Sequence, residues 1–260
     1  METEKLLKHP PVNNAFYDDL GERWYQDDGH IIALLRAEAK LKLTYLRGIF
    51  EETQLSIGSS ILDIGCGAGF ISNELARDGF QLYGLDQSGG SLAVAARHAP
   101  PTTRISYTVG EAYHLPYASE SFDSVLLLDI LEHVDDPARM LAEASRVLKP
   151  KGLLFFHTFN RTLLSRFFAI EAVSFVARDS PKNFHVWNLF IKPEELKEML
   201  QPLGLRVKSM RGIKPVLSHW PLWSSILKRQ VHKDFAFSFT SSLSLGYIGY
   251  AQKFAATPDL

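Results

Sequence analysis

The sequence has very little cysteine, no long apolar run and no excess of charge of one sign. Its single cysteine, Cys66, excludes a disulfide within the chain, which suits a reducing compartment. No apolar stretch approaches the roughly 20 residues that a membrane-spanning helix needs. Lysine and arginine number 28 against 29 acidic residues, and there is no basic arm. The composition therefore gives no reason to expect nucleic acid as a partner.

The first residues of the sequence also lack the basic and then apolar pattern of a signal peptide. We therefore expect a cytoplasmic protein that contacts a membrane at most peripherally. The 260 residues, 46% of them hydrophobic, suffice for one large core. Internal repeats and low-complexity segments are absent from the sequence, and we treat residues 1–260 as a single domain.

What the sequence does have is a glycine-rich turn after a short apolar segment. Residues 60–69 are Ser-Ile-Leu-Asp-Ile-Gly-Cys-Gly-Ala-Gly, and Asp86 ends a second apolar run 17 residues later. A glycine turn after a first strand, with an acid at the end of the next strand, is how α/β folds bind a nucleoside. The glycines allow the backbone to approach the ligand, and the acid accepts hydrogen bonds from ribose hydroxyls.

The spacing of this turn differs from that of dinucleotide sites. Those sites use G-x-G-x-x-G to bring a helix N-terminus to pyrophosphate, whereas this chain has D-x-G-x-G-x-G with Asp63 ahead of the first glycine. A carboxylate there is unfavourable beside pyrophosphate and favourable beside a cationic ligand. The spacing thus opposes an NAD-dependent oxidoreductase, and the remaining alternative is a glycine turn without a ligand. Cys66 is interpreted as a small buried residue near the ligand.

Strands and helices alternate through the middle of the chain. Apolar, β-rich segments separated by helices predict a parallel sheet that is covered on both faces. We expect N-terminal helices in 13–52, a cofactor-binding core in 58–158, an insertion or lid in 161–190, and the rest of the sheet with an acceptor region in 191–254. Residues 213–245 are expected to be irregular. The predicted strands are 60–64, 81–86, 104–109, 122–128, 152–158, 205–211 and 245–251.

Six blocks, in order, resemble the class I S-adenosylmethionine-dependent methyltransferases. They are the glycine turn, Asp86, residues 110–117, 122–125, 131–134 and 146–152. The resemblance implies an α/β, Rossmann-like fold with a seven-stranded, mostly parallel sheet whose last strand is antiparallel. It also implies S-adenosylmethionine as cofactor, whose ammonium and sulfonium suit the acid ahead of the glycines.

The same resemblance implies which residues contact the cofactor. Asp86 would bind the ribose, the start of the glycine turn would lie by the methionine end, and Glu111 and Ala112 would lie by the adenine. Lys42 falls near a basic position that helps to bind the cofactor in relatives, with a solvated surface lysine as the alternative. The full candidate set is Lys42, Asp63, Gly65, Gly67, Gly69, Asp86, Glu111, Ala112 and Leu128.

Further blocks look like the ubiquinone-biosynthesis O-methyltransferases, which methylate phenolic hydroxyls of polyprenylated quinone precursors. These blocks are 24–25, 159–162, 190–196, 212–213 and 246–250. The resemblance implies a lipid-like phenol or catechol substrate, peripheral membrane contact and association with other quinone-biosynthesis proteins. The interior of the insertion departs from the family pattern, so the acceptor stays open. The alternatives are another small molecule methylated on O, N or C, and a non-catalytic cofactor-binding partner protein.

A phenol with a pKa near 10 needs a general base or a metal ion before it attacks the methyl group. Asp129, Glu132 and His133 share one helical face if the strand end continues as a helical turn. Relatives with Glu, Glu and His at this place bind magnesium, so the resemblance implies a Mg²⁺ site here; capping or cofactor-pocket roles are the alternative. The catalytic candidates are Asp129, His133 and His157, and His157 could equally be a core histidine. We expect His185 at the surface, with a mobile base as the alternative.

The insertion, residues 161–190, concentrates apolar side chains among Arg161, Arg166 and Arg178. An amphipathic helix with basic flanks can lie in a membrane interface. A lid over the active site and an ordinary core helix are the alternatives. Either this segment or residues 215–240 would offer an apolar path to a polyprenyl tail.

Overall fold

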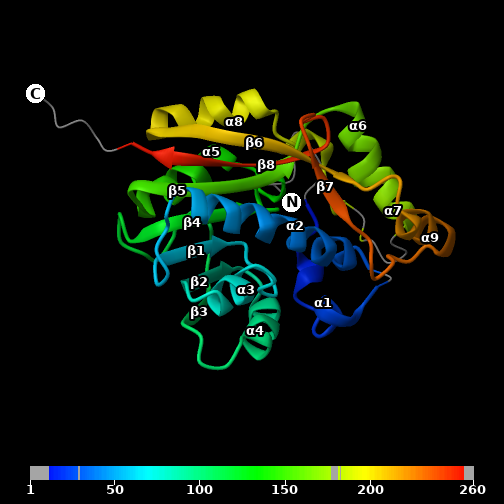
Figure 1. The fold of residues 1–260 in the computed structure, drawn as a ribbon, viewed down its shortest axis with the longest axis horizontal. Helices are drawn as coiled ribbons and strands as arrows, with labels where there is room; N and C mark the ends of the chain where they lie inside the picture. The colour runs from blue at the N-terminus through cyan, green and yellow to red at the C-terminus, as the bar shows by residue number, and fades with distance from the viewer. Residues whose placement is uncertain (1–11, 29, 177–180, 182, 255–260) are drawn as a thin grey trace, which may run out of the picture.

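A computed structural model describes residues 12–28, 30–176, 181 and 183–254. Arg178, one of the basic residues expected beside the insertion, lies outside the described residues. The described chain forms an eight-stranded sheet with the order β3-β2-β1-β4-β5-β8-β6-β7 and helices on both faces (Figure 1). The strands are β1 (Ser60–Ile64), β2 (Gln81–Asp86), β3 (Ile105–Val109), β4 (Phe122–Leu128), β5 (Leu148–Phe159), β6 (Leu205–Pro215), β7 (Phe237–Thr240) and β8 (Gly246–Lys253).

The helices precede, connect and follow these strands. Short 3-10 turns include η2 (Ala15–Tyr17) and η3 (Leu131–His133), and η4 (Phe167–Ala172) is a π-helical stretch between α6 and α7. The α-helices are α1 (Arg23–Gln26), α2 (Ile32–Glu52), α3 (Ser72–Arg77), α4 (Gly89–His98), α5 (Pro137–Val147), α6 (Leu163–Arg166), α7 (Val173–Val176), α8 (Pro193–Leu200) and α9 (Trp220–Lys228).

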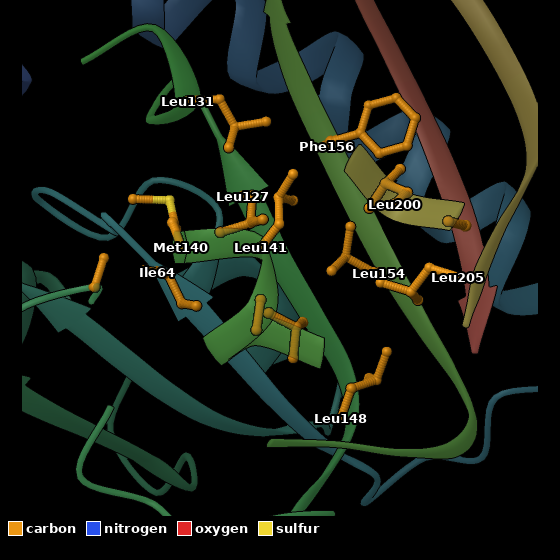
Figure 2. Close-up of a cluster of buried hydrophobic side chains, with 14 of the residues drawn as sticks. Ile64, Leu127, Leu131, Met140, Leu141, Leu148, Leu154, Phe156, Leu200 and Leu205 are labelled. Atoms are coloured by element: carbon orange, nitrogen blue, oxygen red, sulfur yellow. The ribbon is translucent and has the colours of Figure 1, made fainter. Parts of the chain in front are cut away.

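Apolar side chains of the central strands point alternately to the two faces of the sheet, so the core has two parts, one on each face. In β4, Val125 and Leu127 pack on one face, while Leu126 and Leu128 pack on the other. Successive side chains of a strand point to opposite faces, so a strand covered on both sides is apolar throughout. Figure 2 shows the first face, where α5 and α8 cover the sheet; α2 and α3 cover the second.

The predicted α/β fold is confirmed. Strands β3, β2, β1, β4 and β5 run parallel, and β8 lies antiparallel between β5 and β6. The carboxyl ends of the parallel strands therefore meet at one edge, which is where open α/β sheets bind their ligands.

Two expectations were wrong in the C-terminal part. The sheet has eight strands and not seven, because β7 pairs antiparallel with β6 and forms an additional strand at the edge of the sheet. Residues 213–245 are accordingly not irregular throughout: they contain the end of β6, helix α9 and β7. Strand β7 is Phe-Ser-Phe-Thr, whose period-two alternation indicates a strand, but four residues are too few to show it among neighbouring aromatics.

The described part of the insertion forms a helical stretch through α6, η4 and α7. Thr162 caps its start, since the Thr162 Oγ1 accepts a hydrogen bond from the Ser165 amide at 3.0 Å. Helix α7 packs against α9, so the insertion and the segment between β6 and β7 lie together (Figure 1). None of the helices in the described part of the chain is both long and apolar enough to cross a bilayer.

Candidate active site

A cavity of about 530 Å³ opens at the carboxyl ends of β1, β2 and β4. The glycine turn, which connects β1 to α3, forms part of the cavity wall. Seven of the residues expected to contact the cofactor line the cavity: Lys42, Asp63, Gly65, Gly67, Asp86, Ala112 and Leu128. Among the described residues, the lining does not include Gly69 or Glu111, and the Glu111 side chain is 67% exposed.

The three glycines of the turn have positive φ angles, and each has a close neighbour. At Gly65, with φ +74°, an added Cβ would lie 2.4 Å from Ile130 Cδ1. At Gly69, with φ +76°, it would lie 2.5 Å from the Tyr107 hydroxyl. Only glycine meets both conditions without strain. Gly69 therefore shapes the turn through its packing, although it does not reach the cavity.

Asp86 is held by backbone amides at the end of β2. Its Oδ2 accepts a hydrogen bond from the Gly67 amide at 2.8 Å, and its Oδ1 accepts one from the Ser88 amide at 2.9 Å. Burial raises the pKa of Asp86, and these amides oppose the rise. The carboxylate is thus fixed beside the glycine turn, in a position suited to ribose hydroxyls.

Asp63 is a buried carboxylate that lines the same cavity. Its Oδ2 accepts a hydrogen bond from the Ser72 hydroxyl at 2.6 Å, and the residue is 3% exposed. Burial raises the pKa of Asp63 to about 7. A cationic ligand in the cavity would favour the ionised form, because an opposite charge lowers the pKa of a buried acid.

A second, largely apolar cavity of about 300 Å³ lies beside the first. Its walls come from α2, the insertion, α9 and the strands β6, β7 and β8. Four of the described residues line both cavities: Tyr17, Leu35, Asp129 and His133. The apolar insertion and the aromatic residues 215–240 each predicted an apolar path from the sequence. The structure shows that both segments contribute to the walls of one cavity.

Asp129 does not continue β4 into a helical turn, so the expected shared face with Glu132 and His133 was wrong. Asp129 has a left-handed φ of +58°, and η3 begins only at residue 131. Its carboxylate binds the Lys42 Nζ at 2.5 Å and the His157 Nδ1 at 2.5 Å. Burial alone would raise the pKa of Asp129, but the Lys42 ammonium and His157 hold it well below its usual range. Such an ionised carboxylate is too weak a base for a phenol.

Lys42 and His157 are both engaged by neighbouring carboxylates. Lys42 is 1% exposed and bridges Asp129 to Glu38, whose Oε2 lies 2.9 Å from the Lys42 Nζ. It is therefore neither a solvated surface lysine nor a free ammonium in the cavity. His157 is fully buried and lines neither cavity, which agrees with its interpretation as a core histidine.

Glu132, His133 and His185 form a second cluster, with ligand atoms that all lie within 4.8 Å of one another. Glu132 Oε1 and His133 Nδ1 are buried and have no hydrogen-bond partner among the described residues. Burial lowers the pKa of His133 to about 4 and that of His185 to about 3, so both imidazoles are neutral. His185 packs against His133 and Phe159, so the expectation of a surface histidine was wrong.

The N-terminal segment contributes site residues that the motifs did not reveal. Tyr17 and Trp24 line the cofactor cavity, and their rings stack with centroids 5.5 Å apart. The Trp24 ring lies over Gly67, where an added Cβ would be 3.0 Å from Trp24 Cη2. Trp24 belonged to a short family-like block, but nothing in that block indicated contact with the glycine turn, which lies over 40 residues away in sequence.

Comparison with known proteins agrees with this geometry. A family model described as a methyltransferase domain matches residues 62–156. Among solved structures, magnesium protoporphyrin IX methyltransferase from Synechocystis PCC 6803 with bound S-adenosylhomocysteine has a TM-score of 0.61 at 16% identity, covering 93% of this chain and 95% of that one. The cyclase SpnF has a TM-score of 0.57 at 21% identity, covering 82% and 81%. The fold is thus that of the class I methyltransferases, and because a cyclase shares it, the fold alone does not define the reaction.

Sequence relatives identify the family within this class. The ubiquinone biosynthesis O-methyltransferase of Azorhizobium caulinodans is 34% identical over 223 residues, covering 82% of this chain and 88% of the relative. That of Aliivibrio fischeri is 33% identical over 209 residues, covering 80% and 88%. The chain belongs to the ubiquinone biosynthesis O-methyltransferase family, and it is a methyltransferase that uses S-adenosylmethionine.

Proposed function

We propose that the chain transfers the methyl group of S-adenosylmethionine to a phenolic hydroxyl of a polyprenylated quinone precursor. The observation that carries this proposal is the junction of a polar cofactor cavity with an apolar cavity at Asp129 and His133. An acceptor whose phenol lies at the junction can extend an apolar tail into the second cavity. The names of the relatives support the same acceptor.

The residues act mainly by position. Methyl transfer is an in-line displacement, so the sulfonium and the acceptor oxygen must approach to about 3–3.5 Å in line. The glycine turn and Asp86 would hold the cofactor from one side, while Phe159 and the insertion form apolar walls on the other. The Lys42 and His157 contacts hold Asp129 ionised at the junction, where its charge favours the cationic cofactor.

We further propose that Glu132, His133 and His185 hold a divalent cation. The buried, unpartnered oxygen and nitrogen and the neutral imidazoles fit such an ion. One carboxylate with two imidazoles suits a borderline ion such as Zn²⁺ better than Mg²⁺, which prefers oxygen ligands. When bound, the ion would lower the pKa of a phenol that contacts it.

The cation proposal is tested by titrating the protein with Zn²⁺ and with Mg²⁺ in a calorimeter. We expect Zn²⁺ to bind at one site, with the affinity reduced at least tenfold in His185→Ala. His114→Ala is the matched control, because the His114 side chain is 69% exposed and outside the cluster. Equal Zn²⁺ binding by His185→Ala and the unmodified protein would rule out this ligand set.

Exposed apolar side chains on the insertion, on α9 and just before α9 support peripheral contact with a membrane. Basic residues of the same segments, including Arg166 and Arg229, lie beside these side chains in the sequence. Trp at an apolar surface with basic neighbours is typical of interfacial segments. We use the name apolar face for these exposed side chains, which are Leu163, Leu164, Phe167, Phe175, Leu217, Trp220, Trp223 and Leu227.

Vesicle flotation tests this membrane contact. We expect the protein to float with vesicles of an anionic phospholipid at low salt, and a Trp220→Ser, Leu227→Ser double variant to remain at the bottom of the gradient. Ile57→Ser is the control, since Ile57 is also exposed, at 77%, but lies outside the apolar face. Absence of flotation for the unmodified protein at low salt would contradict the proposal.

The acceptor itself is tested by incubating the protein with S-adenosylmethionine and a short-chain polyprenylated catechol. We expect a monomethyl ether, and a much higher KM for the same catechol without its tail, because burial of apolar surface stabilises the complex by about 25 cal/mol per Å². Equal KM values for the two catechols would contradict the role of the apolar cavity. No ether from either catechol would contradict the proposed acceptor.

A further inference from the structure

Tyr17 lies where the two cavities meet, and neither the motifs nor the family-like blocks gave it a role. Of the four residues that line both cavities, Leu35 is apolar, Asp129 is engaged by Lys42 and His157, and His133 belongs to the cation cluster. Tyr17 is the one of these four residues that carries a hydroxyl group. Its ring also meets the edge of His133, with centroids 6.4 Å apart.

The position of Tyr17 depends on contacts with the cofactor-binding part of the chain. Its ring stacks on Trp24 at 14°, and Trp24 lies over Gly67 of the glycine turn. The Trp24 indole N–H donates to Ser91 Oγ at 3.2 Å, and the Ser91 hydroxyl donates to the Tyr17 carbonyl at 3.0 Å. Both the ring and the backbone of Tyr17 are thus tied to elements that surround the cofactor cavity.

We infer that Tyr17 is an acceptor-site residue whose hydroxyl donates a hydrogen bond to the phenolic oxygen of the acceptor. We also infer that the glycine turn sets the position of Tyr17 through Trp24. The inference rests on the proposed methyl transfer to a phenol. A hydrogen bond to a developing phenolate is charge-assisted and therefore stronger than one to a neutral oxygen.

The coupling through Trp24 predicts an order of binding. With the cofactor present, Gly67 and Trp24 are fixed, and the stacked Tyr17 ring completes the acceptor site. Without the cofactor, the glycine turn is held less firmly, and so are the Trp24 and Tyr17 rings that pack on it. Acceptor binding should therefore be weaker. Coupling of this kind is reciprocal, and the acceptor should strengthen cofactor binding by the same factor.

Steady-state kinetics of Tyr17→Phe test the hydroxyl. We expect kcat/KM for the catechol to fall about 10- to 100-fold, as for a lost hydrogen bond to a charged group, and the Kd of S-adenosylhomocysteine to stay within about twofold. Tyr83→Phe is the matched control, since the Tyr83 hydroxyl bonds to Gln81 within β2 and lines neither cavity. Unchanged kcat/KM in Tyr17→Phe, or an equal loss in Tyr83→Phe, would overturn the inference.

A double-mutant cycle of Trp24→Phe and Tyr17→Phe tests the coupling. We expect the two losses in kcat/KM to be less than additive, because Tyr17→Phe removes the hydroxyl and Trp24→Phe disturbs the position of that same hydroxyl. Additive losses would overturn the coupling.

Amide hydrogen exchange provides a test that needs no acceptor. Addition of S-adenosylhomocysteine should slow exchange in residues 12–27 of the unmodified protein at least tenfold, and much less in Trp24→Ala. Unaltered exchange in this segment would overturn the inference. Failure of the proposed function is distinguishable, since the unmodified protein would then bind the cofactor and slow this exchange but leave the catechol unmethylated.

Discussion

At the scale of single residues, Asp63 and Asp86 present two different carboxylate environments to the same cavity. Asp86 is held by two backbone amides, whereas Asp63 is buried with one hydroxyl as its partner. The first arrangement suits a neutral diol, and the second suits a cation. That both acids line one cavity could be predicted from the sequence, because Asp63 directly precedes the glycine turn and Asp86 ends the next strand.

Replacing Asp86 by Asn should weaken binding of S-adenosylhomocysteine about 10- to 100-fold, because a hydrogen bond to a charged group contributes about 1.5–3 kcal/mol. Isothermal calorimetry measures this change. Asp78→Asn is the control, since Asp78 pairs with Arg47 at the surface. An unchanged Kd in Asp86→Asn would mean that the ribose lies elsewhere.

The pKa of about 7 at Asp63 predicts a pH dependence of cofactor binding. The cationic cofactor prefers the ionised carboxylate, so affinity should rise about tenfold between pH 6 and pH 8. The ligand-free protein should lose stability as the pH rises from about 4 to about 7 and then level off, because over this range the folded chain keeps a proton that the unfolded chain has given up. Titrations at several pH values measure the effect, and Asp63→Asn should remove it. A flat profile in the unmodified protein would contradict the assignment.

At the scale of secondary-structure elements, a contact between α2 and the residue after β4 replaces the predicted metal site. That prediction placed Asp129, Glu132 and His133 on one helical face. Lys42 of α2 lies between Glu38 and Asp129, and the left-handed backbone at Asp129 turns the carboxylate toward it. Sequence spacing assumes a regular element, so it cannot predict such a turn. For the same reason it could not predict that the insertion brings His185 to His133, since that contact depends on tertiary packing.

Replacing Lys42 by Met should lower the free energy of unfolding by about 3–5 kcal/mol, because it leaves the buried Glu38 and the partly buried Asp129 carboxylates without their cation. Adding Asp129→Asn to this variant should restore part of the loss. Lys40→Met is the control, since Lys40 is an exposed residue of the same helix. Urea denaturation measures all three. Equal stability of Lys42→Met and the control would show that the cluster contributes nothing.

At the scale of the whole molecule, the order of strands brings the cofactor cavity and the apolar cavity to one edge of the sheet. The parallel half, with its long apolar strands and the glycine turn, could be predicted because each element carries its own periodicity. The C-terminal half could not be fully predicted, because β7 and α9 are short and depend on β6 and on α7, respectively, for their partners. The walls of the apolar cavity come largely from this second half.

The central claim is that these two cavities hold a methyl donor and a tailed phenol at the same time. The most direct test is a single-turnover experiment with S-adenosylmethionine labelled in its methyl group and a polyprenylated catechol. The account predicts that the label appears on a catechol oxygen of the tailed substrate, and that Asp86→Asn slows the transfer at subsaturating cofactor. Label that stays on the cofactor, although the cofactor binds and the catechol is present in excess, would contradict it.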